Sequence, residues 1–420
     1  MGFPSRLLGV LIVPLFVAGA SFPMGDGDGE DPGTKATRAI QEVPLASTVV
    51  VGFNHTCGLA EDGSVYCWGE NNSGQLGDGG TEDTRQAQRV AGDLVFESVS
   101  VGHRRTCGVA DGQVYCWGWN RFGILGDGTD QDQFEPVPVS AGQTFNTVSV
   151  GTRHTCALTD TGEAYCWGVN RQGQLGDGTR EDRADPAPVS GGHSFVSLSS
   201  GLEHTCGLTE AGEAYCWGNN HIGQIGDGTR TDSRPEPTSV EGEHTFESIE
   251  AGYNVTCGLT AEGQAFCWGA NHTGAVGDGT DENRTEPTPV AGEHTFRSIS
   301  VGQLHVCGLT SDDRALCWGF NSRGQLGDGT RANRDTPVEV EGGHTFASIS
   351  AGSHRTCGVT GDGQAYCWGH RFGEGFVAEG AIDAAADDND EEDDDIDMVD
   401  EDEDVLEPRP EAEGITFRAR

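Results

Sequence analysis

Short runs of alternating apolar and polar residues recur along the chain, separated by turns rich in glycine, aspartate and asparagine. Within one fifty-residue stretch the runs are Phe145–Val150, His154–Leu158, Glu163–Trp167 and Asp185–Ser190. Runs of this length with a period of two are typical of half-buried β-strands. This stretch therefore predicts four consecutive strands, which we name A, B, C and D in chain order.

The same four runs return about every fifty residues, and the cysteines mark the period. The chain has 14 cysteines in seven pairs, and subtracting successive first members gives spacings of 49 to 51 residues. The pairs are Cys57 with Cys67, Cys107 with Cys116, Cys156 with Cys166, Cys206 with Cys216, Cys257 with Cys267, Cys307 with Cys317, and Cys357 with Cys367. A fixed period of this size indicates a solenoid or propeller. Seven four-stranded units favour an all-β, seven-bladed β-propeller.

The turn between strands B and C fixes how the cysteines face each other. In six repeats the loop has three residues, such as Glu61-Asp62-Gly63, and such loops favour glycine third, where φ is positive. Only Asp313 departs from glycine there. The second repeat is one residue shorter and has Asp111-Gly112, a preferred two-residue hairpin turn.

Both loop lengths place the two cysteines of a repeat directly opposite one another. We therefore predict one disulfide in every blade. Free thiols are the alternative, but the even count and strict pairing disfavour them. Zinc ligation is less favoured still, because no C-x-x-C spacing occurs.

The N-terminus has the pattern of an export signal. Arg6 is followed by the apolar stretch 7–17 and by Ala18-Gly19-Ala20, a small-x-small cleavage pattern. Residues 1–20 are thus predicted to be removed, leaving an N-terminal segment 21–44 in a secreted, periplasmic or cell-surface protein. No later run of about twenty apolar residues occurs, so no membrane span is expected.

The chain is strongly acidic. It has 67 Asp plus Glu against 25 Lys plus Arg, a formal charge of -42. Binding to nucleic acid needs a basic surface, so no nucleic-acid partner is expected. Many of the carboxylates lie in residues 379–406, and within them 387–404 is nearly all Asp and Glu. Self-repulsion predicts a disordered acidic insertion there.

The repeats define one propeller domain over residues 45–378. Their boundaries are about 45–92, 93–142, 143–192, 193–242, 243–292, 293–342 and 343–378. The last repeat lacks its own strand D, and two segments are candidates to supply it. Residues 407–420 begin with Glu407-Pro408-Arg409-Pro410, similar to Glu286-Pro287-Thr288-Pro289, and Thr37–Pro44 is the alternative.

The repeated text resembles the regulator of chromosome condensation repeat over residues 45 to 372. It reads G-x-x-H-T-C-G-L, then Y-C-W-G-x-N-x-x-G-Q-L-G-D-G-T. The resemblance implies a seven-bladed propeller. Members of that family include a nuclear exchange factor for a small GTPase, a plant UV-B photoreceptor and a secreted bacterial inhibitor of β-lactamase. Fold alone does not choose among such functions.

Two of these functions fit the sequence poorly. The even repeat spacing leaves no room for the inserted wedge that the exchange factor uses, and an exported chain would not meet a nuclear GTPase. The photoreceptor has a tryptophan directly after the glycine of its G-W-R-H-T motif. This chain has other residues there, namely Phe53, His103, Thr152, Leu202, Tyr253, Gln303 and Ser353.

No catalytic or metal-binding set stands out. The histidine of G-x-x-H-T recurs as His55, His154, His204 and His305, which favours a structural hydrogen-bonding role over chemistry. The aspartate of L-G-D-G-T lacks a calcium-loop pattern and is expected to form Asx turns. The tryptophans of Y-C-W-G are expected in the core. We expect a non-enzyme with no cofactor and no metal.

Sequence variation gathers on the A–B and C–D connections, which a four-strand meander places on one face. The predicted partner-binding residues are Phe53, Asn54, His103, Arg104, Trp119, Arg121, Phe122, Arg153, Arg171, His221, Tyr253, Asn254, Phe320, Arg323, His354, Arg371 and Phe372. Aromatic and arginine residues on variable loops suit a binding surface. Neutral variation of exposed loops is the alternative.

The sequence therefore predicts a secreted, monomeric, non-enzymatic binding module for a protein or surface polymer. The alternative function, which the family name suggests, is a guanine-nucleotide exchange factor-like regulator of a small GTPase.

Overall fold

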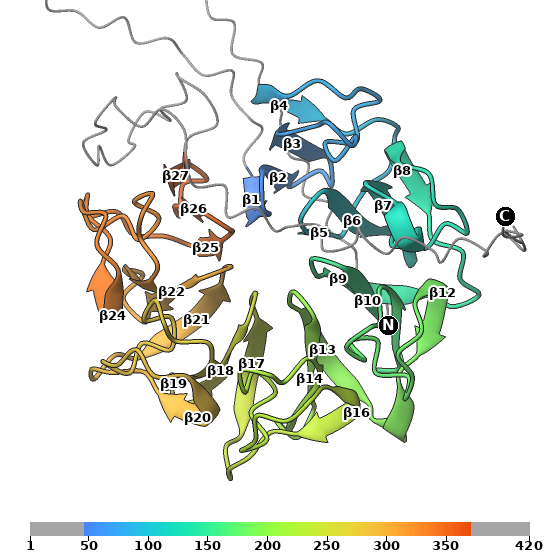
Figure 1. The fold of residues 1–420 in the computed structure, drawn as a ribbon. Coiled ribbons are helices and arrows are strands. Elements are labelled where there is room, and N and C mark those ends of the chain that lie inside the picture. Colours follow the sequence, from blue (N-terminus) through green and yellow to red (C-terminus); the bar gives the residue numbers. More distant parts are fainter. Residues whose placement is uncertain (1–45, 371–420) are drawn as a thin grey trace, which may run out of the picture. The chain divides into compact units, whose positions relative to one another are not determined.

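The computed structural model describes residues 46–370, which form seven antiparallel sheets around a central axis (Figure 1). Each sheet is one blade of a propeller, and the blades follow one another around the ring in chain order. Six blades have four strands, and the seventh has three strands among the described residues. The predicted all-β, seven-bladed fold is confirmed.

The four strand classes recur in every blade. The A strands are β1 (Ala46–Val51), β5 (Ser98–Val101), β9 (Phe145–Val150), β13 (Phe195–Ser200), β17 (Phe246–Ala251), β21 (Phe296–Val301) and β25 (Ser348–Ala351). The B strands are β2 (His55–Ala60), β6 (Arg105–Ala110), β10 (His154–Thr159), β14 (His204–Thr209), β18 (Val255–Thr260), β22 (His305–Thr310) and β26 (Arg355–Val359).

The outer half of each blade is equally regular. The C strands are β3 (Val65–Gly69), β7 (Gln113–Gly118), β11 (Ala164–Gly168), β15 (Ala214–Gly218), β19 (Ala265–Gly269), β23 (Ala315–Gly319) and β27 (Ala365–Gly369). The D strands are β4 (Thr84–Arg89), β8 (Gln133–Pro138), β12 (Arg183–Pro188), β16 (Arg234–Ser239), β20 (Arg284–Pro289) and β24 (Arg334–Glu339). Two 3-10 turns are η1 (Arg121–Gly123) and η2 (Ser190–Gly192).

Several predicted segments lie outside the described residues. These are the export signal 1–20, the N-terminal segment 21–44, the acidic insertion 379–406 and the closing candidate 407–420. Arg371 and Phe372 of the predicted binding surface also lie outside them.

The predicted hairpin register is confirmed in every blade, because the two cysteines of each repeat lie directly opposite one another. The turn residues have the backbone that this register requires. Asp111 and Gly112 have φ of 50° and 71°, and Asp313 has φ of 65°.

All seven predicted disulfides are present, and in each of them the two Cα atoms are 4.1 Å apart. The bonded pairs are Cys57 with Cys67, Cys107 with Cys116, Cys156 with Cys166, Cys206 with Cys216, Cys257 with Cys267, Cys307 with Cys317, and Cys357 with Cys367. Every bridge therefore joins strand B to strand C within one blade. The prediction of one disulfide per blade is confirmed.

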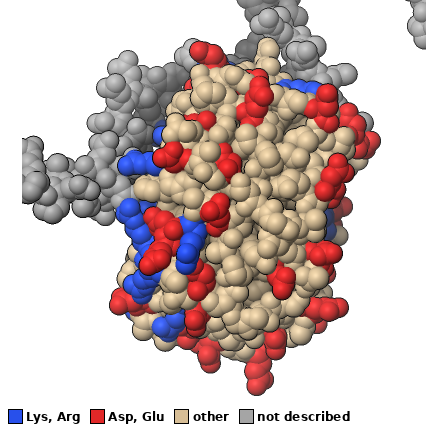
Figure 2. Space-filling model, turned by 90° about the vertical axis from the view of Figure 1, so that its right-hand side faces the viewer, with Lys and Arg blue, Asp and Glu red and all other residues tan. Residues whose placement is uncertain are grey.

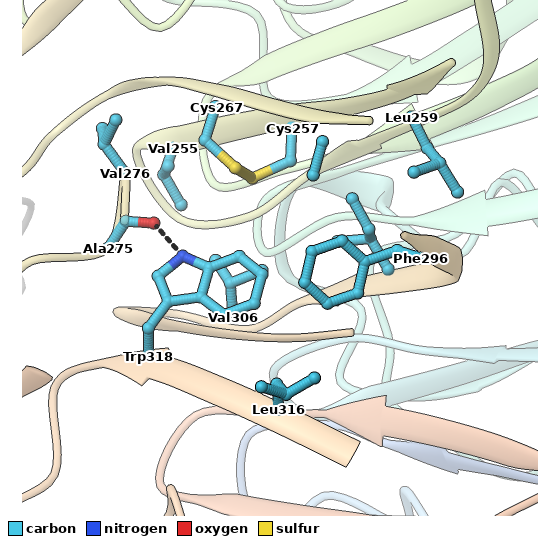
Figure 3. Close-up of a cluster of buried hydrophobic side chains, with 12 residues drawn as sticks. Val255, Cys257, Leu259, Cys267, Ala275, Val276, Phe296, Val306, Leu316 and Trp318 are labelled. Carbon is cyan, nitrogen blue, oxygen red and sulfur yellow. Dashed lines mark hydrogen bonds between the residues drawn. A yellow bond between two sulfur atoms is a disulfide. The ribbon is translucent and has the colours of Figure 1, made fainter. Parts of the chain in front are cut away.

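The hydrophobic core lies between neighbouring blades. At one junction Val255, Cys257 and Leu259 of the fifth blade pack against Phe296 and Trp318 of the sixth (Figure 3). The indole Nε1 of Trp318 donates to the carbonyl of Ala275, 3.0 Å away in the preceding blade. The repeated tryptophans are therefore core residues that join one blade to the next, as predicted.

A ring of glycines at the ends of the A strands brings the seven blades together. A Cβ atom on Gly52 would lie 2.6 Å from the carbonyl oxygen of Gly102, and the equivalent glycines repeat this contact around the ring. The circle closes where Gly352 meets the carbonyl of Gly52, and the amide of Val51 donates to Ser350 Oγ at 3.0 Å. The first and seventh blades thus contact each other directly.

Candidate partner-binding face

Backbone hydrogen bonds place the A–B and C–D connections on one face. The amide of Glu70 donates to the carbonyl of Asn54, and that of Trp119 to Arg104, both at 2.9 Å. At the opposite end the amide of Phe96 donates to Gly63 in the B–C turn, also at 2.9 Å. We call the surface formed by the A–B and C–D connections the loop face. The predicted topology is confirmed.

The C–D connections have a repeated internal scaffold. In the third blade Asp177 Oδ1 accepts from the amide of Thr179 at 2.9 Å and from Asn170 Nδ2 at 3.1 Å. Arg183 Nε, at the start of β12, donates to Asp177 Oδ2 at 3.1 Å. Burial opposes ionisation, yet the hydrogen bonds from Thr179, Arg183 and Asn170 lower the pKa of Asp177 overall. The expected Asx turn is thus confirmed.

The repeated histidines join blades rather than forming a reactive site. The Nε2 atom of His154 lies 2.7 Å from Thr205 Oγ1, and His55, His204 and His305 form the equivalent contact with the next blade. Burial, followed by the charge of Arg105, lowers the pKa of His154 to about 3. These side chains are neutral near pH 7 and have the structural role that the sequence predicted.

Aromatic side chains cluster near the axis on one side of the loop face. The ring centroids of Phe53 and His103 lie 4.3 Å apart with a T-shaped geometry. His354 lies 6.2 Å from Phe53 and 6.2 Å from Phe320, also T-shaped. Four residues predicted on separate repeats therefore form one contiguous group across the sixth, seventh, first and second blades.

A second group of predicted residues lies on the second and third blades. Arg121 and Arg171 place their guanidinium carbons 5.1 and 5.8 Å from the ring centroid of Phe122. Trp119 lies 6.5 Å from Phe122 in a T-shaped arrangement. We call Trp119, Arg121, Phe122 and Arg171 the arginine–aromatic patch. Such cation–π contacts hold exposed arginines in place.

The remaining predicted residues are spread over the other blades. Arg153 pairs with Glu203 at 3.3 Å, Asn254 Oδ1 accepts from Gln224 Nε2 at 3.3 Å, and His221 is exposed. Burial raises the pKa of Tyr253. Arg323 is half-buried in the C–D connection of the sixth blade. The structure thus brings eight of the predicted residues into two compact groups and leaves these five, together with Asn54 and Arg104, outside them.

Sequence reasoning missed some participants. Glu203 was not predicted, although it pairs with Arg153 and accepts a 2.9 Å hydrogen bond from Asn219. Thr152, Leu202 and Gln303 line a central opening together with Phe53, His103 and Tyr253. The signal was available, because each of these lining residues directly follows the ring glycine of its repeat.

Charge is unevenly distributed over this part of the molecule. Most of the Lys and Arg side chains visible in Figure 2 gather along one edge of the propeller, whereas Asp and Glu lie both among them and over the remaining surface. In residues 93–192 every arginine belongs to an A–B turn, a C–D connection or the strand end beside one. The arginines of the second and third blades therefore lie on the loop face, where Asp127, Asp130, Asp132, Asp177, Glu181 and Asp182 of the same C–D connections lie as well.

Two further features bear on the class of site. Among residues 46–370 no three His, Cys, Asp or Glu side chains gather in a way that could hold a metal ion. In the same part of the chain, no helix has the length and apolar character needed to cross a membrane.

Comparison with known proteins identifies the repeat. A family model described as "RCC1-like domain" matches residues 15–345, and one described as "Regulator of chromosome condensation (RCC1) repeat" matches residues 346–371. The chain is 34% identical over 106 residues to the E3 ubiquitin-protein ligase HERC2 of Homo sapiens. That match covers 23% of this chain and 2% of HERC2.

Several solved structures share the fold. Prp20p from Saccharomyces cerevisiae, described with its binding to Gsp1p and histones, aligns with a TM-score of 0.66 at 22% identity over 73% of this chain and 80% of its own. Human WBSCR16 aligns with a TM-score of 0.70 at 20% identity over 77% and 91%. The ectodomain of the Arabidopsis thaliana receptor kinase ACR4 aligns with a TM-score of 0.51 at 23% identity over 78% and 98%.

Proposed function

The chain belongs to the family of RCC1-like domains, and from that membership we propose that it is a non-enzymatic module that binds a protein partner through its loop face. RCC1-like propellers bind proteins, as the description of Prp20p shows for that relative. Fold alone does not assign the partner, so the proposal rests on the surface itself.

One observation carries the proposal. The scaffold of the C–D connections repeats with the same hydrogen bonds, for example from Asn170 and Asn321 to the aspartate seven residues later. The side chains presented on this scaffold nevertheless differ in every blade and include contiguous aromatic residues and arginines. Rigid frames that display varied aromatic and arginine side chains are typical of protein-binding surfaces.

The disulfides indicate where the protein works. All cysteines of the described residues are paired, one bridge in every blade. Such bridges form and persist in oxidising, extracellular environments. We propose export as the route to that environment, with the N-terminal pattern around Arg6 as its signal. Cell fractionation of the tagged full-length chain tests this step.

The proposed function is tested by affinity capture from extracellular fluid. The bait is the mature protein, and the loop-face variant carries Phe53→Ala, Phe122→Ala and Arg171→Ala. A matched control carries Glu163→Ala, Glu213→Ala and Gln264→Ala, exposed residues beside the B–C turns on the opposite face. A partner retained by wild type and control but lost by the loop-face variant supports the proposal. Equal capture by all three proteins contradicts it.

The likeness to Prp20p raises a second function, regulation of a small GTPase as a guanine-nucleotide exchange factor. We favour the binding module, because the blades between residues 46 and 370 follow one another with no inserted segment. A nucleotide-release assay separates the two functions. Release accelerated by this protein supports exchange, and an unchanged rate supports simple binding.

A further inference from the structure

The backbone at Phe122 differs from that of every equivalent residue. Phe122 has φ of 66°, in the left-handed region that bulky side chains rarely adopt. The equivalent residues in the other described C–D connections have negative φ, and they are Ser73, Gln172, Ile222, Thr273 and Arg323. The repeated scaffold therefore does not require this conformation. Strain of this kind is found preferentially at functional sites.

The aromatic ring of the strained residue contacts two positive charges. Arg121 comes from the same blade, whereas Arg171 comes from the next blade, fifty residues later, and both contact the Phe122 ring. Arg121 and Arg171 are exposed, and Trp119 and Phe122 are half-buried. Binding hot spots in protein interfaces are enriched in arginine and in large aromatic residues such as tryptophan.

The loop segments that carry and flank this patch are rich in positive charge. The A–B turns and the first residues of the C–D connections in the second and third blades are 103–104, 119–122, 152–153 and 169–172. They contain four arginines and no Asp or Glu. Glu203 of the next blade supplies a carboxylate to Arg153. The six Asp and Glu of these two C–D connections lie in their later residues, 127–132 and 177–182, so the positive charge is confined to the first residues, where it favours a negatively charged group of a partner.

The same region contains an unsatisfied charged donor. Arg104 Nε is buried and has no hydrogen-bond acceptor in the described part of the chain. The electrostatic effect of the arginines is visible at His103, where burial and then Arg104, Arg105 and Arg153 lower the pKa to about 4. His103 is thus kept neutral mainly by burial, with a further contribution from the neighbouring arginines.

We propose that the arginine–aromatic patch binds an acidic polypeptide segment of a partner protein, with carboxylates on Arg121 and Arg171 and an apolar side chain against Trp119 and Phe122. This inference rests on the proposed function and names the chemistry of its partner. Carboxylates form charge-assisted hydrogen bonds with guanidinium groups, and the ring stacking pre-orients both arginines for them. The acidic remainder of the protein repels such a partner elsewhere and so directs it to the patch.

The test uses the full-length chain and a short labelled peptide of alternating glutamate and phenylalanine. A matched peptide with glutamine in place of glutamate reports the part of the affinity that is not electrostatic. A chain lacking residues 387–404 is measured in parallel, because that acidic segment can compete with the peptide. We expect the glutamate peptide to bind at least one of the two chains, and salt to weaken the binding.

The decisive variant is Phe122→Gly. Glycine accepts positive φ without strain, so thermal stability should be unchanged or raised, while peptide affinity falls at least about tenfold. The double variant Arg121→Ala, Arg171→Ala should also lose binding. Arg314→Ala removes an exposed charge beside the B–C turn of the sixth blade and serves as the matched control.

Three results overturn the inference. They are no binding of the glutamate peptide to either chain, equal binding of the glutamine peptide, and full affinity in Phe122→Gly. None of them overturns the proposed function if affinity capture still depends on the loop face. Conversely, wild type, control and loop-face variant could capture the same proteins equally while the glutamate peptide still binds the patch. That result would reject the proposed function and leave the patch as a site for acidic peptides.

Discussion

Glu250 lies in β17, the A strand of the fifth blade, at a position where five other blades have serine. Those serines accept hydrogen bonds from the amides of the next blade at 2.8 to 3.1 Å, as Ser199 does from Ala251. Burial raises the pKa of Glu250 to about 7, against a hydrogen bond from Ser199 that lowers it. A carboxyl group therefore stands where the repeat otherwise uses a neutral hydroxyl.

The raised pKa makes stability depend on pH. The folded chain holds the Glu250 proton more tightly than the unfolded chain, so this contribution is present below about pH 4.5 and is lost as the pH rises through about 7. Glu250→Ser should raise the free energy of unfolding at pH 8 by up to about 3 kcal/mol and change little at pH 4. Thermal melts across this range measure it, with Glu250→Gln as the uncharged control. A stability difference independent of pH would contradict the assignment.

In the second repeat, Arg105 stands where most repeats have the histidine of G-x-x-H-T. Its guanidinium is fully buried and donates to the carbonyls of Gly151, Thr152 and His154 at 3.0, 2.8 and 2.6 Å. It also donates to Thr155 Oγ1 at 3.3 Å. Thr155 is equivalent to the threonines that contact the repeated histidines at the other junctions. Burial lowers the pKa of Arg105 to about 9, and the carbonyls replace its lost hydration.

Removing Arg105 should therefore destabilise the junction between the second and third blades. Arg105→Ala leaves three carbonyls without their hydrogen-bond donor and creates a cavity. It should lower the free energy of unfolding, measured with denaturant, by about 3 to 5 kcal/mol. Arg105→His should recover most of the loss, because Nε2 can then bond to Thr155 as His154 bonds to Thr205. Equal destabilisation by both substitutions would show that the carbonyl contacts of arginine are indispensable.

The hairpins were predictable because their determinants are local. The loop residues from Glu61 to Gly63 and the pair Asp111-Gly112 fix the turn types, and the turns fix the cysteine register. Strand D was predicted as Asp185–Ser190 but spans Arg183–Pro188. Its first residue, Arg183, forms an ion pair with Asp177, a contact across a loop that alternation of apolar residues does not reveal.

The candidate site was predictable as a list of residues but not as an arrangement. Topology and sequence variation indicated the loop face. The partition into two groups depends on contacts between repeats, such as Arg171 on Phe122 and His354 on Phe53. The positive φ of Phe122 had no signal in the sequence, because the equivalent positions are not glycine.

Among the residues that the structure describes, no fourth strand pairs with the outer edge of β27. In each described junction the last residue of strand A stands eleven positions after the valine that follows the preceding strand D, as Val150 does after Val139. Val51 is the last residue of strand A in the first blade, and eleven positions before it stands Ile40. The start of this strand A also has the register of the other blades, because Ala46 pairs with Ala60 as Phe145 pairs with Thr159. We therefore expect the N-terminal segment, rather than residues 407–420, to supply the missing strand.

Two substitutions decide this closure. Ile40→Asp should lower the melting temperature by several degrees and speed hydrogen exchange in Ala365–Gly369, because closure by the N-terminal segment would bury this position and the substitution would place a charge there. Glu411 stands in the C-terminal candidate where Val290 stands in the similar fifth-blade segment. Glu411→Val should change neither quantity. A stabilising Glu411→Val together with a neutral Ile40→Asp would assign the closure to the C-terminus.

The acidic segment 387–404 and the arginines at the start of the C–D connections in the second and third blades have opposite charge. Residues 387–404 contain 14 Asp and Glu and no Lys or Arg. The last described residue, His370, lies on the loop face, where its amide donates to the carbonyl of His354 at 2.7 Å. Sixteen residues separate it from Asp387, an extended reach of about 50 Å.

This arrangement leads us to predict that the segment competes with anionic ligands for the loop face. Deleting Asp387–Asp404 should increase retention on heparin at low salt, and the increase should vanish near molar salt, where charge interactions are screened. An uncharged Asn/Ser segment of equal length controls for the loss of chain. Adding Arg121→Ala and Arg171→Ala to the deletion should abolish the gain, because these arginines would be the heparin contacts. Unchanged retention after the deletion would leave the acidic segment with a solubilising role only.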